Sequence, residues 1–143
     1  EGGYDFGISL HCDSSDNPQA HGAHVCFYPG SVKGSRLAIC IAEPLSRLLP
    51  GRANTVRSRP GVPVRKTTPC RWVQRVLFRT ASPGRANTVQ SRPGLAVLKK
   101  TRCPWVLCEC GFITNPENAS ILKDHPFRIA EAIAEGVKDY INQ

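Results

Sequence analysis

The chain has 143 residues, which is enough for one domain with a hydrophobic core and too short for two comfortable ones. Hydrophobic residues make up 41% and charged residues 21%, as in ordinary globular proteins, and no apolar run approaches the ~20 residues of a membrane-spanning helix. The formal net charge is +8, and the stretch between Pro44 and Cys108 contains no Asp or Glu, a pattern that would ordinarily indicate a polyanionic partner.

The first fifty residues predict two short strands, a polar loop between them and a helix. The apolar run at residues 7–11 and the alternating run at residues 23–28 are both typical of strands. Asp13–Pro18 is polar and indicates a loop. Leucine and isoleucine recur at helical spacing between Ser35 and Leu49, and Pro44 is expected to kink or shorten that helix.

The middle of the chain contains an internal repeat. The segment from Gly51 to Gly61 returns almost unchanged from Gly84 to Gly94. Two copies are too few for a solenoid. The similarity ends after Val73 and Val106, where codons for Arg75-Val76 and for Cys108-Glu109-Cys110 can share one base string read in two frames. We therefore interpret residues 51–83 as a duplicated insert that slipped frame. Coding segments that do not align after a one-base shift would contradict this interpretation. On this interpretation the excess of positive charge results from the duplication, and we expect no nucleic-acid partner. The alternative is a protein that binds nucleic acid through this basic stretch.

The last third predicts a strand followed by two helices. Pro104–Cys110 is an apolar run of strand length, as in a central strand buried on both faces. Asn115 and Pro116 are a typical helix start, with Asn115 as the N-cap. A closing helix of about four turns carries an apolar stripe, Ile129, Ile133, Val137 and Ile141. The order of the elements predicts an α/β fold in which helices cover a mainly parallel sheet.

The seven cysteines are an odd number and include no C-x-x-C doublet, so they cannot all pair within the chain. Most lie in apolar strings, as Cys26 and Cys40 do. We interpret them as small buried hydrophobic side chains of a chain made in a reducing cytosol. A metal site formed by Cys103, Cys108 and Cys110 is disfavoured, because no fourth ligand lies nearby in the sequence.

Two residues could carry chemistry. His11 ends a short apolar run and opens into a polar loop, so its imidazole could bind a metal while the nearby carboxylate of Asp13 orients its other nitrogen; a structural histidine is the alternative. Glu109 lies in an otherwise apolar strand, where an unpartnered carboxylate is costly. Desolvation would raise the pKa of Glu109 and suit it to act as a general base, and a satisfied buried ion pair is the alternative.

Both residues lie in stretches that match motifs of one enzyme family. The segment Ser9-Leu10-His11-Cys12-Asp13, followed by residues 17–23, resembles the strand and loop S-x-H-A-[ND] and x-G-x-x-x-[YF]. The segment from Leu95 to Glu117 resembles L-x-V-L-[RK]-x-T-x-x-P-A-V-L-[VL]-E-x-G-F-[LI]-[ST]-N-x-x-[ED], and residues 129–136 look like a closing helix. These are features of the amidase type 3 family of zinc-dependent N-acetylmuramoyl-L-alanine amidases. The resemblance covers roughly residues 5–50 and 84–141.

The resemblance implies a cofactor, an activity and a location. His11 takes the place of a zinc-binding histidine, and Glu109 takes the place of the glutamate that activates the zinc-bound water. The implied reaction is hydrolysis of the amide bond between N-acetylmuramic acid and L-alanine. Peptidoglycan is the implied partner, and the protein is expected to act at the cell wall or as a secreted enzyme, as a bacterial autolysin or a phage endolysin.

The sequence also departs from the family. Two further zinc ligands, a His and a Glu, lie upstream in the family, and nothing before Asp5 can supply them. We therefore expect residues 1–143 to be a partial catalytic domain without the family's first strand and helix. His21 and His24 are candidates for substitute ligands, and His125 is expected on the surface between two helices.

Two consequences follow from these departures. In the family, a short connection joins the helix that ends near Leu49 to a strand at Leu95. Residues 51–83 therefore have no counterpart in the family. The missing ligands also leave an alternative function open, in which the chain is a catalytically incomplete remnant that binds cell-wall polymer without turnover.

Overall fold

The computed structural model describes residues 3–51 and 89–143 of the chain. Within them, the strands are β1 (Gly7–Asp13), β2 (His24–Phe27), β3 (Val89–Ser91) and β4 (Trp105–Phe112). They form one sheet in the order β1-β4-β2-β3, in which β1 pairs with β4 and β2 with β3 in parallel, while β2 and β4 are antiparallel. The predicted α/β fold is confirmed, with a mixed sheet in which two of these three pairings are parallel.

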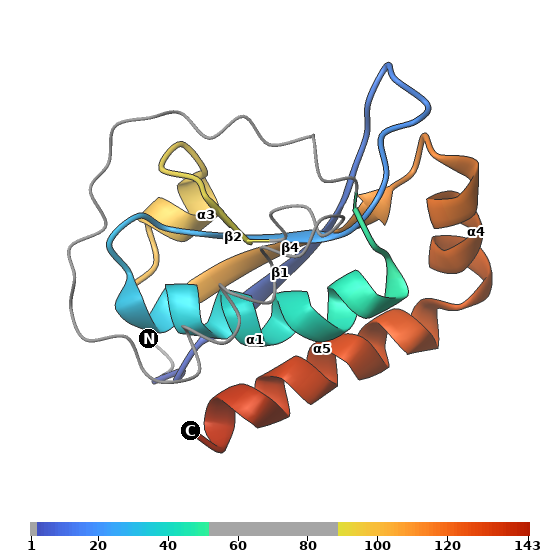
Figure 1. Cartoon of the computed structure of the whole chain (residues 1–143). Helices are drawn as coiled ribbons and strands as arrows, with labels where there is room; N and C mark the ends of the chain where they lie inside the picture. Colours follow the sequence, from blue (N-terminus) through green and yellow to red (C-terminus); the bar gives the residue numbers. More distant parts are fainter. Residues whose placement is uncertain (1–2, 52–88) are drawn as a thin grey trace.

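The helices of the described residues lie on both faces of this sheet. They are α1 (Val32–Leu48), α3 (Ala96–Lys99), α4 (Pro116–Asp124) and α5 (Pro126–Ile141). The long helices α1 and α5 run side by side along one face, and the short α3 lies on the other (Figure 1). The main core fills the space between the sheet and α1, and its fully buried side chains include Val25, Leu37, Ile41, Leu45 and Val106. None of the described helices is long and apolar enough to cross a membrane.

Helix α1 shows how tertiary packing overrides a local signal. It begins after the N-cap Ser31, whose side chain accepts a hydrogen bond from Gly34 N at 3.1 Å. It then continues through Pro44 to Leu48, so Pro44 does not shorten the helix, and the alternative of a kink at Pro44 stays a prediction. An internal proline costs about 3 kcal/mol, whereas each large apolar side chain that α1 buries against the sheet gains about 1.5–3 kcal/mol. Burial therefore outweighs the proline.

Strand β4 is the central strand, as its apolar run predicts. It pairs with β1 on one side and with β2 on the other. Val106 and Cys108 face the core beneath α1, while Leu107 packs with Cys26 and Leu98 on the opposite face. Because side chains alternate along a strand, Glu109 shares the face of Leu107 and lies opposite the main core.

The predicted helix start, strand and apolar stripe in the second half of the chain agree with the structure only in part. Helix α4 starts as expected, because Asn115 is its N-cap and accepts a hydrogen bond from Asn118 N at 3.1 Å. Leu95 does not lie in a strand: it is the N-cap of α3, and the strand of this region is β3. In the closing helix Ile129 is buried, but Ile141 is 65% exposed and lies beyond the core. Apart from Gly51, the proposed insert at residues 51–83 lies outside the described residues.

The cysteines of the described residues are all free. Cys26, Cys108 and Cys110 are buried as predicted, whereas Cys12 is exposed. Burial raises the pKa of Cys26 and of Cys110 to about 11 and raises that of Cys108 further, so these thiols stay protonated at neutral pH. No group of three His, Cys, Asp or Glu side chains that could hold a metal occurs within residues 3–51 and 89–143.

Candidate active site

His11 and Glu109, the two residues predicted to carry chemistry, lie next to each other in the sheet. In the parallel pairing of β1 with β4, His11 is the direct partner of Glu109. In the antiparallel pairing of β4 with β2, Glu109 is also the direct partner of His24. Directly paired residues point to the same face, with neighbouring strands about 4.8 Å apart. His11, Glu109 and His24 therefore form a row of three side chains across the sheet, on the face opposite the main core.

His11 lies at the accessible end of this row. Its side chain is exposed, and its Nε2 lies 3.1 Å from Ser9 Oγ on the same strand. The pairing of β1 with β4 is irregular immediately after His11, so that Asp13 pairs with Phe112. A β-bulge of this kind redirects side chains at the end of a strand. An exposed imidazole that neighbours a carboxyl group can bind a metal ion or exchange protons.

Glu109 lies in the middle of the row and is partly buried. Its Oε2 is buried and has no hydrogen-bond partner among the described residues. Burial raises the pKa of Glu109, and the negative charge of Asp13 acts in the same direction. The charges of His11 and Arg92 oppose these effects. A carboxyl group with a raised pKa accepts a proton more readily than an ordinary glutamate.

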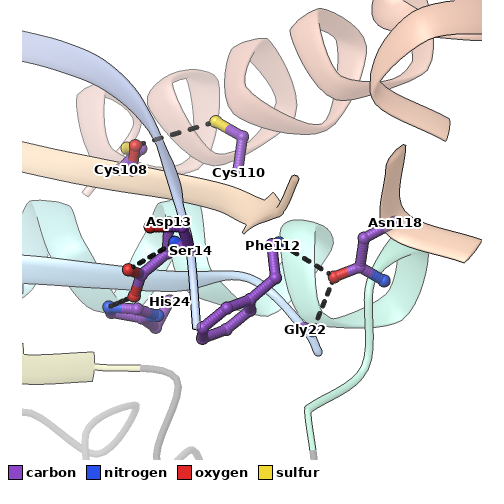
Figure 2. A network of polar contacts seen from close by, with 8 residues as sticks. All are labelled: Asp13, Ser14, Gly22, His24, Cys108, Cys110, Phe112 and Asn118. Carbon is purple, nitrogen blue, oxygen red and sulfur yellow. Dashed lines mark hydrogen bonds and ion pairs between the residues drawn. The ribbon is translucent and has the colours of Figure 1, made fainter. Parts of the chain in front are cut away.

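Asp13 was predicted in the loop, but it is the last residue of β1, and its contacts reach across the sheet. One carboxylate oxygen accepts a hydrogen bond from Ser14 N at 2.8 Å. The other, Oδ2, lies 3.9 Å from Nε2 of His24 (Figure 2). The proposed orientation of His11 by Asp13 stays a prediction.

His24 closes the other end of the row, and its side chain is only 11% exposed. Burial lowers the pKa of His24, the nearby charge of Asp13 opposes this shift, and Arg92 adds to it. The imidazole is therefore neutral at physiological pH. Sequence reasoning considered His24 only as a substitute zinc ligand. Its place beside Glu109 could not be read from the sequence, because it depends on the register between β2 and β4.

Polar contacts hold the loop between β1 and β2 against the end of β4. The side-chain oxygen of Asn118, a residue 5% exposed, accepts hydrogen bonds from Gly22 N at 2.8 Å and from Phe112 N at 3.1 Å (Figure 2). Asn115 donates to Pro18 O at 2.9 Å. The loop between β1 and β2 extends beyond the end of the sheet (Figure 1). Sequence reasoning missed Asn118, which follows the predicted N-cap by one helical turn.

Gly111 lies near the end of β4, against the side chain of Asn118. It has a φ of +111°, which favours glycine, and a Cβ there would lie 3.1 Å from Asn118 Oδ1. A side chain at this position would therefore strain the backbone and crowd Asn118, whose hydrogen bonds hold the loop between β1 and β2.

Zinc is the cofactor that the resemblance implies, and the described residues do not complete a site for it. His11 offers an exposed imidazole, and Glu109 offers a buried oxygen that has no hydrogen-bond partner in the described part of the chain. A catalytic zinc normally has three protein ligands. No group of three His, Cys, Asp or Glu side chains that could hold a metal is found in the described part of the chain.

An imidazole and a carboxyl group of raised pKa on adjacent strands are groups of the kind that act as general acids and bases in enzymes. The family model described as N-acetylmuramoyl-L-alanine amidase (Amidase_3) matches residues 1–139. The match spans nearly the whole chain, and the protein belongs to the N-acetylmuramoyl-L-alanine amidase family.

Solved structures of amidases have a similar fold. The CwlD amidase from Clostridioides difficile, solved with the GerS lipoprotein, is 22% identical, with a TM-score of 0.68 over 99% of this chain and 57% of that one. The catalytic domain of the CD27L endolysin, which targets Clostridia difficile, is 25% identical, with a TM-score of 0.64 over 96% of this chain and 56% of that one.

A mycobacterial enzyme gives the same result. The amidase Ami1 from Mycobacterium smegmatis is 20% identical, with a TM-score of 0.68 over 96% of this chain and 54% of that one. The chain thus spans a little over half the length of these relatives. No curated protein matches it.

Proposed function

We propose that this protein hydrolyses the amide bond between N-acetylmuramic acid and L-alanine in peptidoglycan, with Glu109 as the general base. The observation that carries this proposal is the partly buried Glu109, whose Oε2 has no hydrogen-bond partner among the described residues and which pairs in the sheet with the exposed His11. Family membership supplies the reaction class, and the site supplies a group suited to it. The proposed place of action is the cell wall or the space outside the cell.

The chemistry follows from the protonation of one carboxyl group. Ionised Glu109 takes a proton from water while the water oxygen bonds to the amide carbon. The C–N bond then breaks, and the same carboxyl group returns the proton to the departing amine of L-alanine. Because burial raises the pKa of Glu109, the carboxyl group retains the proton more readily than an ordinary glutamate between these two transfers.

We further propose that His11 is one ligand of a zinc ion and that donors outside the described residues complete its coordination. When bound, zinc would supply a Lewis acid that polarises the amide carbonyl and lowers the pKa of water. His11 fits this role because its imidazole is exposed and adjoins Glu109.

A second function remains a candidate, namely binding of cell-wall polymer without turnover. One observation favours it: the described residues contain no group of three side chains that could hold a metal. Such a protein would bind soluble muramoyl peptides without zinc, and its binding would not depend on the charge of Glu109.

Zinc content and turnover, measured together, separate the two functions. We expect about one zinc per chain by elemental analysis and release of L-alanine-terminated peptides from peptidoglycan. His11→Ala should lose both, whereas Glu109→Gln should keep the zinc and lower kcat at least on the order of 100-fold, because the base is gone. His125→Ala, an exposed position between α4 and α5, serves as the control. A wild-type chain that binds muramoyl peptide but has neither zinc nor turnover would support the second function.

A further inference from the structure

The short helix α3 lies on the face of the sheet that carries Glu109. Its buried residue Leu98 packs against Leu107 of β4 and Cys26 of β2. Leu107 and Glu109 are two positions apart on β4, so they point to the same face and lie roughly 7 Å apart along the strand. The long helices α1 and α5 lie on the opposite face (Figure 1). Helix α3 therefore borders the candidate active site.

Exposed cations lie at the C-terminal end of α3. Lys99 is its last residue and Lys100 its C-cap, and Arg102 follows in the connection to β4. All three are exposed, and within residues 3–51 and 89–143 neither lysine forms an ion pair. No Asp or Glu occurs from Val89 to Cys108, so the chain around α3 brings no carboxylate to neutralise them.

The charges on the opposite face are balanced. Helix α5 carries two cations, Arg128 and Lys138, together with three acids, Glu131, Glu135 and Asp139. A cluster of like charges without counter-charges attracts anions and raises their local concentration. The positive charge beside the candidate site is therefore suited to an anionic group of a bound molecule.

We propose that Lys99 and Lys100 bind carboxylates of the peptide part of the substrate, so that the stem peptide runs from Glu109 along β4 toward α3. This inference rests on the substrate of the proposed function. In a muramoyl peptide the free carboxylates lie on the peptide side of the scissile amide, whereas the sugar side carries uncharged hydroxyl and acetamido groups. The two lysines thus fix which end of the substrate lies over which part of the sheet.

The dimensions of the site are compatible with this orientation. An extended peptide advances about 3.3–3.6 Å per residue, so a few stem residues span the path from the amide beside Glu109 to α3. Lysine side chains are flexible and end in a compact, hydrated charge, which suits contacts with carboxylates at more than one place along the peptide. Because both lysines are exposed, their attraction for the peptide should be screened by salt.

A cycle that combines a charge change on the protein with one on the ligand tests the proposal. The ligands are a soluble muramoyl peptide with free carboxyl groups and the same peptide with these groups converted to amides. Their Kd is measured by calorimetry with the full chain carrying Glu109→Gln, which prevents turnover. Lys99→Gln with Lys100→Gln should weaken binding of the free acid on the order of 10-fold at about 0.02 M salt and change binding of the amide less than about twofold. At about 0.5 M salt the loss for the free acid should largely disappear.

A matched control separates this local effect from the net charge of the protein. Lys33→Gln with Lys138→Gln removes the same two charges from exposed positions of α1 and α5, on the opposite face. This control should leave both Kd values within about twofold of the parent. Thermal melting checks that each double variant is folded, which we expect because all four lysines are exposed.

Several outcomes would overturn the proposal. One is an equal loss of affinity for the free acid and the amide, and another is the same loss in the control. A third is wild-type binding of both peptides together with weaker binding to cell walls that carry phosphate polymers, because the lysines would then bind that polymer instead of the stem peptide.

The binding result is independent of catalysis. If the cycle gives the expected result but the wild-type chain shows no turnover, the role of the lysines stands, hydrolysis fails, and binding without turnover is favoured. If the wild-type chain turns over but the two lysines do not discriminate between the peptides, this inference fails and the proposed function stands.

Discussion

At the scale of single residues, the properties of Glu109 follow from its place in the central strand. A carboxyl group in an apolar strand loses hydration, which favours its neutral form. The neighbouring Asp13 adds to this effect, and His11 and Arg92 reduce it. Ionised Glu109 therefore lowers the free energy of unfolding, and a glutamine of the same shape would avoid this loss. Catalytic groups commonly reduce stability in this way.

This cost depends on pH in a direction that can be worked out. Below the pKa of an ordinary glutamate, Glu109 is protonated in both the folded and the unfolded chain. As the pH rises, the unfolded chain ionises first, and the folded chain loses stability until its raised pKa is passed. Glu109→Gln should therefore melt at a higher temperature than the wild type at pH 7 and at the same temperature near pH 4.

A matched control comes from helix α5. Glu131 is exposed there, and Glu131→Gln should leave the melting temperature nearly unchanged at both pH values. If Glu109→Gln gives no advantage at pH 7, the burial of this carboxyl group is not costly, and the argument for it as a tuned base loses its support.

At the scale of elements, the contact between α1 and α5 depends on one glycine. A Cβ at Gly136 would lie 2.5 Å from the carbonyl oxygen of Cys40 and from the Cα of Ile41, so the two helix backbones meet here. Cys40 lies four residues before Pro44, which has no N–H to donate to its carbonyl. The close approach of α5 thus falls where the hydrogen bonding of α1 is interrupted.

Gly136→Ala distinguishes this packing from intrinsic helix propensity. Propensity alone would make the substitution stabilising by about 1 kcal/mol. The contact with the α1 backbone should instead make it destabilising by about 1–3 kcal/mol, because neither backbone can yield easily. Chemical denaturation measures the sign directly. Ala134→Gly, at an exposed position of α5, measures the effect of helix propensity alone on the same helix. A Gly136→Ala protein that is more stable than the wild type would contradict the close contact between the helices.

At the scale of the whole molecule, the buried cysteines report on cooperative unfolding. Cys26 and Cys108 lie on opposite faces of the sheet, in the two clusters that pack against it. Neither thiol can react while both clusters remain packed, and the raised pKa of each keeps it protonated. Their reaction with a thiol reagent therefore requires an opening of the fold.

Labelling with a thiol reagent, followed by peptide mass spectrometry, tests whether the described residues unfold as one unit. Exposed Cys12 should react in the native protein and faster than the buried cysteines, although burial and the charge of Glu109 raise its pKa. Cys26 and Cys108 should react slowly and at the same rate, which should match the opening rate in mild denaturant. Different rates for these two cysteines would show that the two faces of the sheet open separately.

The sequence by itself determined those features that depend on neighbours along the chain. Alternation and apolar runs predicted β1, β2 and β4, the pair Asn115 and Pro116 predicted the start of α4, and the motifs around His11 and Glu109 predicted the family. Each of these signals is local, because side-chain period and capping are set within a few residues.

Only the tertiary structure decided how these local pieces meet. The row of His11, Glu109 and His24 depends on the register of three strands that are distant in the sequence, and a slip by one residue would turn each side chain to the other face. The continuation of α1 through Pro44 likewise required the burial of its apolar face. Register and burial are properties of the packed sheet and helices, and for that reason no local pattern of residues specifies them.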